Sequence, residues 1–141
     1  MKNKFFLSQL FFLVFVFCLM AGCAHIQEAA KQLWGSSISH LEKERPNGQS
    51  QDFALPLDRC FQEVQDIVNF YRGNVYLKDE KKRYMAAMGF KGFVDTTEVG
   101  IFFTVLDDQH TKIEVASMSP KLMRKVAGYI FTGLQKSIAT Q

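Results

Sequence analysis

The sequence lacks the regularly spaced residues on which most catalytic and metal sites depend. It contains no G-x-S-x-G pattern, so the nucleophile turn typical of α/β-hydrolases is absent. The histidines, His25, His40 and His110, are too scattered for the close i, i+4 spacing of a helical zinc site. We therefore predict no catalytic residues, no metal site and no cofactor. An enzyme, such as a hydrolase assembled from residues distant in sequence, is kept as an alternative.

Cysteine is also scarce, and its positions differ in their surroundings. Cys18 lies inside an apolar run that extends from Phe5 to Met20, and Cys23 follows that run closely. Cys60 lies on the apolar side of a predicted helix, with no histidine nearby in sequence to activate its thiol. We interpret Cys60 as a buried core residue. With no second thiol left for it to pair with, the chain is not a disulfide scaffold.

The apolar run has the layout of a secretory signal. Lys2 and Lys4 precede it, and the run is shorter than the roughly 20 residues of a membrane-spanning helix. It ends at Leu19-Met20-Ala21-Gly22-Cys23, which resembles the lipobox of bacterial lipoprotein precursors. The resemblance implies that Leu19, Met20, Ala21 and Gly22 are recognised by the signal peptidase and that the Cys23 thiol carries diacylglycerol. The family prefers leucine where Met20 stands. An uncleaved anchor and a signal cut elsewhere are the alternatives.

The predicted anchor also indicates where in the cell the protein is located. Attachment through two acyl chains is stable because each buried methylene contributes about 0.8 kcal/mol. Ala24 follows the cysteine where enteric-type bacteria place Asp to retain a lipoprotein in the inner membrane. We therefore expect the periplasmic side of the outer membrane if the cell has two membranes. The expected partners are this membrane and another envelope component, and no nucleic acid is expected.

The mature chain is long enough for one domain with a modest core. We predict a signal peptide at 1–22, a lipid-anchored helical tether at 23–50 and an α+β domain at 51–141. Apolar residues recur at helical spacing over 24–45, and the Pro and Gly of 45–50 end that helix.

Alternating and helical patterns over 51–141 predict the order β-α-β-β-β-β-α. Hairpin connections then give an antiparallel sheet of about five strands with two helices on one face. Asp58 is expected to cap the first of these helices, and Ser119, followed by Pro120, the last. We interpret the GxxG segment at 89–92 as a tight bend within the second of the four consecutive strands.

Three segments resemble a set of small uncharacterised bacterial lipoproteins. They are Trp34-Gly35-Ser36-Ser37 with Leu41-Glu42, Asp95 to Phe103, and Glu114 to Pro120. The resemblance covers most of the mature chain. It implies that a lipobox signal peptide is followed by a βαββββα domain, and it implies no particular activity.

Two groups of basic residues can contact anionic lipid headgroups or an acidic glycan, although solvated faces explain them equally. One group is Lys78, Lys81, Lys82 and Arg83, and the other is Lys121, Arg124 and Lys125. The polar loop Asp95-Thr96-Thr97-Glu98 is a candidate binding loop, with a hydrogen-bonded turn as the alternative.

The first functional hypothesis is a non-catalytic envelope lipoprotein, a binding or structural module that docks on another envelope component. The alternative is a carrier or sensor of a small apolar ligand held between the sheet and the last helix. Such a pocket would be formed by Phe90, Phe102, Phe103, Tyr129 and Phe131.

Overall fold

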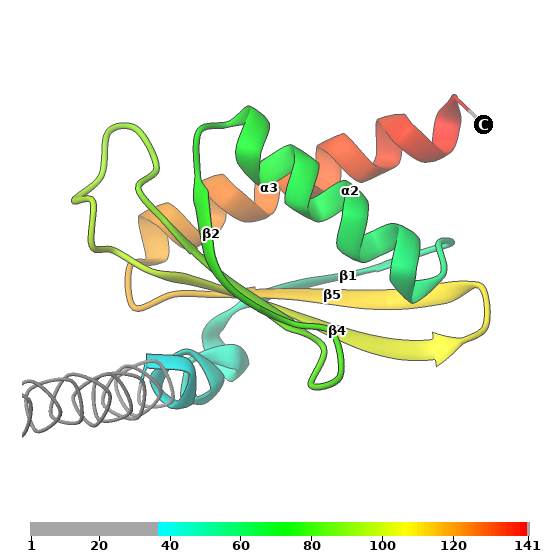
Figure 1. Ribbon diagram of the computed structural model, residues 1–141, viewed down its shortest axis with the longest axis horizontal. Helices are drawn as coiled ribbons and strands as arrows, with labels where there is room; N and C mark the ends of the chain where they lie inside the picture. Colours follow the sequence, from blue (N-terminus) through cyan, green and yellow to red (C-terminus); the bar gives the residue numbers. More distant parts are fainter. Residues whose placement is uncertain (1–36, 141) are drawn as a thin grey trace, which may run out of the picture. The chain divides into compact units, whose positions relative to one another are not determined.

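A computed structural model of the chain describes residues 37–140 (Figure 1). The compact unit Ile38–Gln141 is an α+β domain with a five-stranded antiparallel sheet in the order β1-β5-β4-β3-β2. The predicted fold class and the order β-α-β-β-β-β-α are confirmed. The elements are η1 (Arg45–Asn47), β1 (Gln49–Phe53), α2 (Leu57–Phe70), β2 (Asn74–Asp79), β3 (Tyr84–Met88), β4 (Val99–Asp107), β5 (His110–Ala116) and α3 (Pro120–Ala139).

Both long helices lie on one face of the sheet, as predicted (Figure 1). Strand residues alternate between the two faces, so Ile113 and Val115 of β5 are buried while Glu114 between them is only partly buried. On α2 and α3 the buried residues recur at helical spacing. Phe61 of α2 stacks on Phe103 of β4, with ring centroids 4.1 Å apart. We call this side of the sheet the helix face.

The opposite side, which we call the second face, is covered by the chain that precedes β1. Residues 38–43 are helical, and Ile38 and Leu41 are buried against a cluster that includes Tyr84 and Phe102. Arg45 lies over the Phe102 ring, 4.7 Å from its centroid, and forms an ion pair with Glu114. Because this segment buries apolar surface, the compact unit begins at Ile38, earlier than the predicted boundary at 51.

Local capping agrees with the sequence at α3 and differs at α2. The Ser119 hydroxyl accepts a hydrogen bond from the backbone N–H of Leu122, so the predicted cap is confirmed. The prediction for Asp58 was wrong, because α2 begins at Leu57 and its N-cap is Pro56. Asp58 instead lies in the first turn, where its negative charge favours the partial positive charge of the helix N-terminus.

Strand register brings three connections to the same end of the sheet. Asn74 pairs with Met88, Ala87 with Val99, and Gly100 with Ala116. The end of α2, the long β3–β4 connection and the start of α3 therefore lie at one end (Figure 1). We call residues 70–73, 89–98 and 117–125 the loop end. The β2–β3 and β4–β5 turns lie at the opposite end, which we call the turn end.

Candidate functional site

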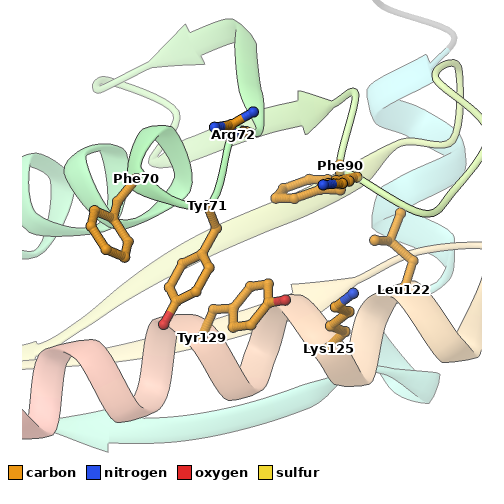
Figure 2. A pocket seen from close by; sticks show the side chains of 8 residues that line it. Phe70, Tyr71, Arg72, Phe90, Leu122, Lys125 and Tyr129 are labelled. Carbon is orange, nitrogen blue, oxygen red and sulfur yellow. The ribbon is translucent and has the colours of Figure 1, made fainter.

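A cleft of about 460 Å³ opens at the loop end, between the end of α2 and the first half of α3 (Figure 2). This volume falls within the range of about 300–1,000 Å³ that is usual for sites of small ligands. Its walls come from three segments that are distant in sequence. The lining residues are Phe70, Tyr71, Arg72, Phe90, Lys91, Leu122, Lys125 and Tyr129.

A row of aromatic rings in mutual contact crosses the cleft. Phe70 meets Tyr71 edge-on, with centroids 5.2 Å apart, and Tyr71 stacks flat on Tyr129 at 3.6 Å. The Lys125 ammonium lies 6.0 Å from the Tyr129 centroid and 5.3 Å from that of Phe93. Figure 2 shows Tyr71 extending from the end of α2 to the Tyr129 side chain on α3. We call these five residues the aromatic row. It links Lys125 and Tyr129 of α3 to the end of α2 and to the β3–β4 connection.

Backbone geometry at two connections places the cleft residues. Arg72 adopts a left-handed conformation, φ 61°, which turns the chain sharply after α2. At Gly73, a Cβ atom would lie 2.5 Å from the Phe90 ring, so only glycine lets Phe90 pack beneath this turn. Gly89 and Gly92 have φ values of 78° and 87°. The GxxG segment is thus a tight bend, as predicted, but it follows β3 and lies outside the strand.

The cleft carries positive charge. Three lining side chains, Arg72, Lys91 and Lys125, are basic, and none is acidic. Over the whole loop end, Lys121 and Arg124 add to these basic residues, and the acidic residues are Asp95 and Glu98. The Glu98 carboxylate accepts a hydrogen bond of 2.8 Å from the Tyr76 hydroxyl. This local excess of positive charge favours an anionic partner.

Large apolar side chains are also exposed at the loop end. The exposed fractions are 80% for Phe70, 71% for Val94 and 74% for Met118. Phe70 ends α2 and lines the cleft, Val94 lies in the β3–β4 connection, and Met118 lies in the β5–α3 connection. Exposed apolar residues that share one end of a domain with a charged cleft are typical of interaction surfaces, whereas single exposed apolar residues need no explanation.

A second cleft, of about 410 Å³, lies on the other side of Tyr71 between α2 and α3. Its lining combines Glu63 and Asp66 with Lys136, so its charges largely offset one another. A hydrogen bond from the Ser137 side chain lowers the pKa of the Glu63 carboxyl, with a smaller contribution from Arg59. The hydrogen bond between Glu63 and Ser137 links α2 to α3, and we interpret this cleft as structural.

The candidate binding loop lies at the loop end but outside the cleft. Asp95 and Thr96 are exposed, while Thr97 and Glu98 are half-buried. The backbone carbonyl of Asp95 accepts from the N–H of Gly89, and that of Glu98 accepts from the Ser117 hydroxyl. These hydrogen bonds fit the alternative interpretation of a bonded turn.

Other residues singled out in the sequence lie apart from the cleft. Cys23 and the recognition residues Leu19, Met20, Ala21 and Gly22 fall outside the described part of the chain, as does His25. His40 and His110 are exposed, and the His110 ring nitrogen Nδ1 lies 2.8 Å from the Asp107 carboxylate. Within residues 37–140, no group of histidine, cysteine, aspartate or glutamate side chains is arranged to hold a metal ion.

Cys60 is a buried core thiol, as predicted. Its side chain is fully buried on the helix face. Burial raises the pKa of the Cys60 thiol to about 11, and the Thr111 hydroxyl offsets this only in part. That hydroxyl is itself buried and forms no hydrogen bond of ordinary geometry with the described residues, so its contact with sulfur is weak. A protonated, buried thiol is a poor nucleophile.

The residues proposed for an apolar ligand pocket do not form one group. Phe90 and Tyr129 line the cleft at the loop end. Phe103 is stacked in the core, and Phe131 packs against Phe53 with centroids 5.8 Å apart. Phe102 belongs to the second face. The space between the sheet and α3 is occupied by packed core side chains.

Comparisons with known proteins add a distant likeness of fold. No family model and no curated protein matches this sequence. The chain is similar to a solution NMR structure from Thermobifida fusca, determined by the Northeast Structural Genomics Consortium, with 14% identity and a TM-score of 0.39. The likeness covers 62% of this chain and 83% of that chain. A similarity this distant carries no argument about function. In the described residues, no helix is long and apolar enough to cross a membrane.

Sequence reasoning missed most of the cleft. No pattern in the sequence marks Phe70 or Tyr71 as a site residue, and Lys91 is predicted only as part of the GxxG bend. A signal was nevertheless present, because Phe70 lies off the apolar stripe of α2 and is exposed. A large apolar residue off the stripe at the end of a helix is an indication of a contact surface.

Proposed function

We propose that this protein is a lipid-anchored envelope lipoprotein whose α+β domain is a non-catalytic binding module. The contact site is the cleft at the loop end, which docks on another component of the envelope. The lipobox-like sequence before Cys23 supports the anchor. The observation that carries the binding role is the exposure of Phe70, Val94 and Met118 at the loop end, where the cleft is lined by basic side chains.

The arrangement of the cleft favours binding over chemistry. Two of its aromatic rings, those of Tyr71 and Tyr129, are stacked on each other. Its lining contains basic side chains and no carboxylate. Buried Cys60, the strongest nucleophile type in the described residues, is on the helix face of the sheet and has a raised pKa. The cleft therefore supplies shape, apolar contact and positive charge.

The anchor is tested by metabolic labelling. In cells given radiolabelled palmitate, the full chain should incorporate label and be shortened at its N-terminus. Cys23→Ala should stay at precursor length and carry no label, because sulfur is the acceptor of the lipid. Cys18→Ala is the matched control and should be processed normally. Normal processing of Cys23→Ala would contradict the proposal.

The binding role is tested by photo-crosslinking in cells. A benzophenone amino acid replaces Phe70 in the full chain, and in a matched control it replaces the exposed Asp108 at the turn end. Illumination should yield discrete adducts from position 70 that are absent from position 108. The same adducts from both positions, or none from position 70, would count against a docking site at the loop end.

A further inference from the structure

We infer that the loop end docks on anionic phospholipid headgroups of the membrane that holds the protein's own lipid anchor. This inference rests on the proposed function and specifies the partner of the same site. It follows from three observations: the exposed apolar residues, the distribution of charge and the length of chain before the domain.

The exposed apolar residues are arranged to enter a membrane interface. Phe70 at the end of α2, Val94 in the β3–β4 connection and Met118 in the β5–α3 connection share one end of the sheet, and they are 71–80% exposed. Tyr71 contacts Phe70 and stacks on Tyr129 in the aromatic row. Tyrosine favours the boundary between headgroups and acyl chains because its ring is apolar and its hydroxyl is polar. Each of these rings and chains loses contact with water when the loop end meets a bilayer.

The charges at the loop end fit a phosphate-bearing surface. Arg72, Lys91 and Lys125 line the cleft and no acidic side chain does. Each basic residue held near an anionic membrane surface is attracted to its phosphate groups. At the turn end, by contrast, the basic residues of 78–83 flank Asp79 and Glu80. The Lys78 ammonium forms an ion pair of 2.9 Å with Glu80, so part of that charge is neutralised internally.

The chain before the domain keeps this surface close to the membrane. Residues 24–37 separate Cys23 from Ile38, where the compact unit begins. Fourteen residues span at most about 50 Å even when fully extended. A lipid on Cys23 therefore holds the domain at an effective concentration of about millimolar near the bilayer surface. A contact of modest intrinsic affinity suffices under this constraint, and the bilayer is the partner that is always within reach.

The test uses the full, lipid-modified chain in nanodiscs, after mass spectrometry has established the lipid on Cys23. A spin label is attached through Met118→Cys, and in a matched protein through Asp108→Cys at the turn end. Buried Cys60 does not compete for the label because its thiol is protonated and inaccessible. Accessibility of the label is measured by collision with a water-soluble nickel chelate and with oxygen.

In nanodiscs that contain phosphatidylglycerol, the label at 118 should show a severalfold fall in nickel collisions compared with phosphatidylcholine alone. The label at 108 should not change. Added salt should reverse the effect in part, because the Debye length is about 8 Å at 0.15 M and shorter above it. Lys91→Glu with Lys125→Glu should abolish the response. The matched pair Lys81→Glu with Lys82→Glu, on exposed residues of the turn end, should retain it.

The outcomes separate this inference from the proposed function. A lipid-modified chain whose label at 118 ignores phosphatidylglycerol overturns the membrane contact and leaves the binding module in place. Protection of that label by soluble peptidoglycan fragments, without any response to anionic lipid, overturns it as well and assigns the loop end to a glycan. A chain that carries no lipid on Cys23 overturns both proposals.

Discussion

The two faces of the sheet are both buried, but by different parts of the chain. The helix face is covered by α2 and α3, and twenty buried residues form its cluster. The second face is covered by residues 38–45, and its cluster contains six. The buried cluster on the helix face is large enough to be the main core of the domain, whereas the cluster on the second face is a small one. The comparison teaches that a segment which reads as a tether can be an integral part of a domain.

This difference also explains the composition of β3. Its residues Tyr84 to Met88 are buried on both sides, apart from Met88, which is partly exposed. Met85 and Ala87 contact the helix face, whereas Tyr84 and Ala86 contact the second face. Burial raises the pKa of the Tyr84 hydroxyl, with smaller contributions from Asp79 and Glu42. The strand β3 therefore shows no polar side.

The largest expected effect lies on the helix face. Ile130→Ala removes a fully buried side chain of α3 and should lower the free energy of unfolding by about 3 kcal/mol, because a cavity remains. Urea unfolding followed by circular dichroism measures this. Gln135→Ala, on the exposed side of the same helix, should change the stability by less than about 0.5 kcal/mol. Equal effects of the two changes would contradict the assigned core.

A smaller loss of stability is expected on the second face. Leu41→Ala should cost about 2 kcal/mol in the same assay, since Leu41 is 2% exposed but its cluster is smaller and relaxes more easily. Ser39→Ala, exposed on the same short helix, is the matched control and should have little effect. If Leu41→Ala behaved like Ser39→Ala, residues 38–43 would be a tether after all.

The pH dependence of stability should show whether water is excluded from the Cys60 thiol on the helix face. The Cys60 pKa rises from 9.0 to about 11 on folding, so the unfolded chain loses this proton first as the pH increases. Stability should then fall between these two values, with a slope approaching about 1.4 kcal/mol per pH unit from this group. Unfolding of wild type and Cys60→Ala at several alkaline pH values isolates the contribution, because other titrating groups are shared. Parallel profiles would mean that the thiol is hydrated.

The smallest effect is expected at the edge of the second face. Arg45 and Glu114 form an ion pair whose side chains are 36% and 20% exposed, and Arg45 also covers the Phe102 ring. A double-mutant cycle with alanine at both positions should give a coupling of about 1 kcal/mol, reduced by salt. The i, i+4 pair Arg59 and Glu63, on α2, should give about 0.3–0.5 kcal/mol. A coupling at Arg45 below that of this pair would show that the segment is held by its apolar residues alone.

The sequence by itself determined the elements of the domain and their order. Alternation of apolar residues predicted β4 and β5, since strand side chains point to opposite faces whatever the surroundings. Ser119 and Pro120 predicted the start of α3 because capping is decided within one turn. The lipobox-like sequence before Cys23 is likewise local, and the lipid it predicts stays a prediction.

Tertiary structure alone decided where the domain begins and where its exposed site lies. Ile38 and Leu41 become core residues only because the folded sheet presents an apolar second face to them. The cleft brings together Tyr71 after α2, Lys91 of the β3–β4 connection and Lys125 of α3, which strand register aligns at one end. No pattern along the chain encodes such contacts, because they depend on which surfaces remain uncovered after the helices and strands have packed.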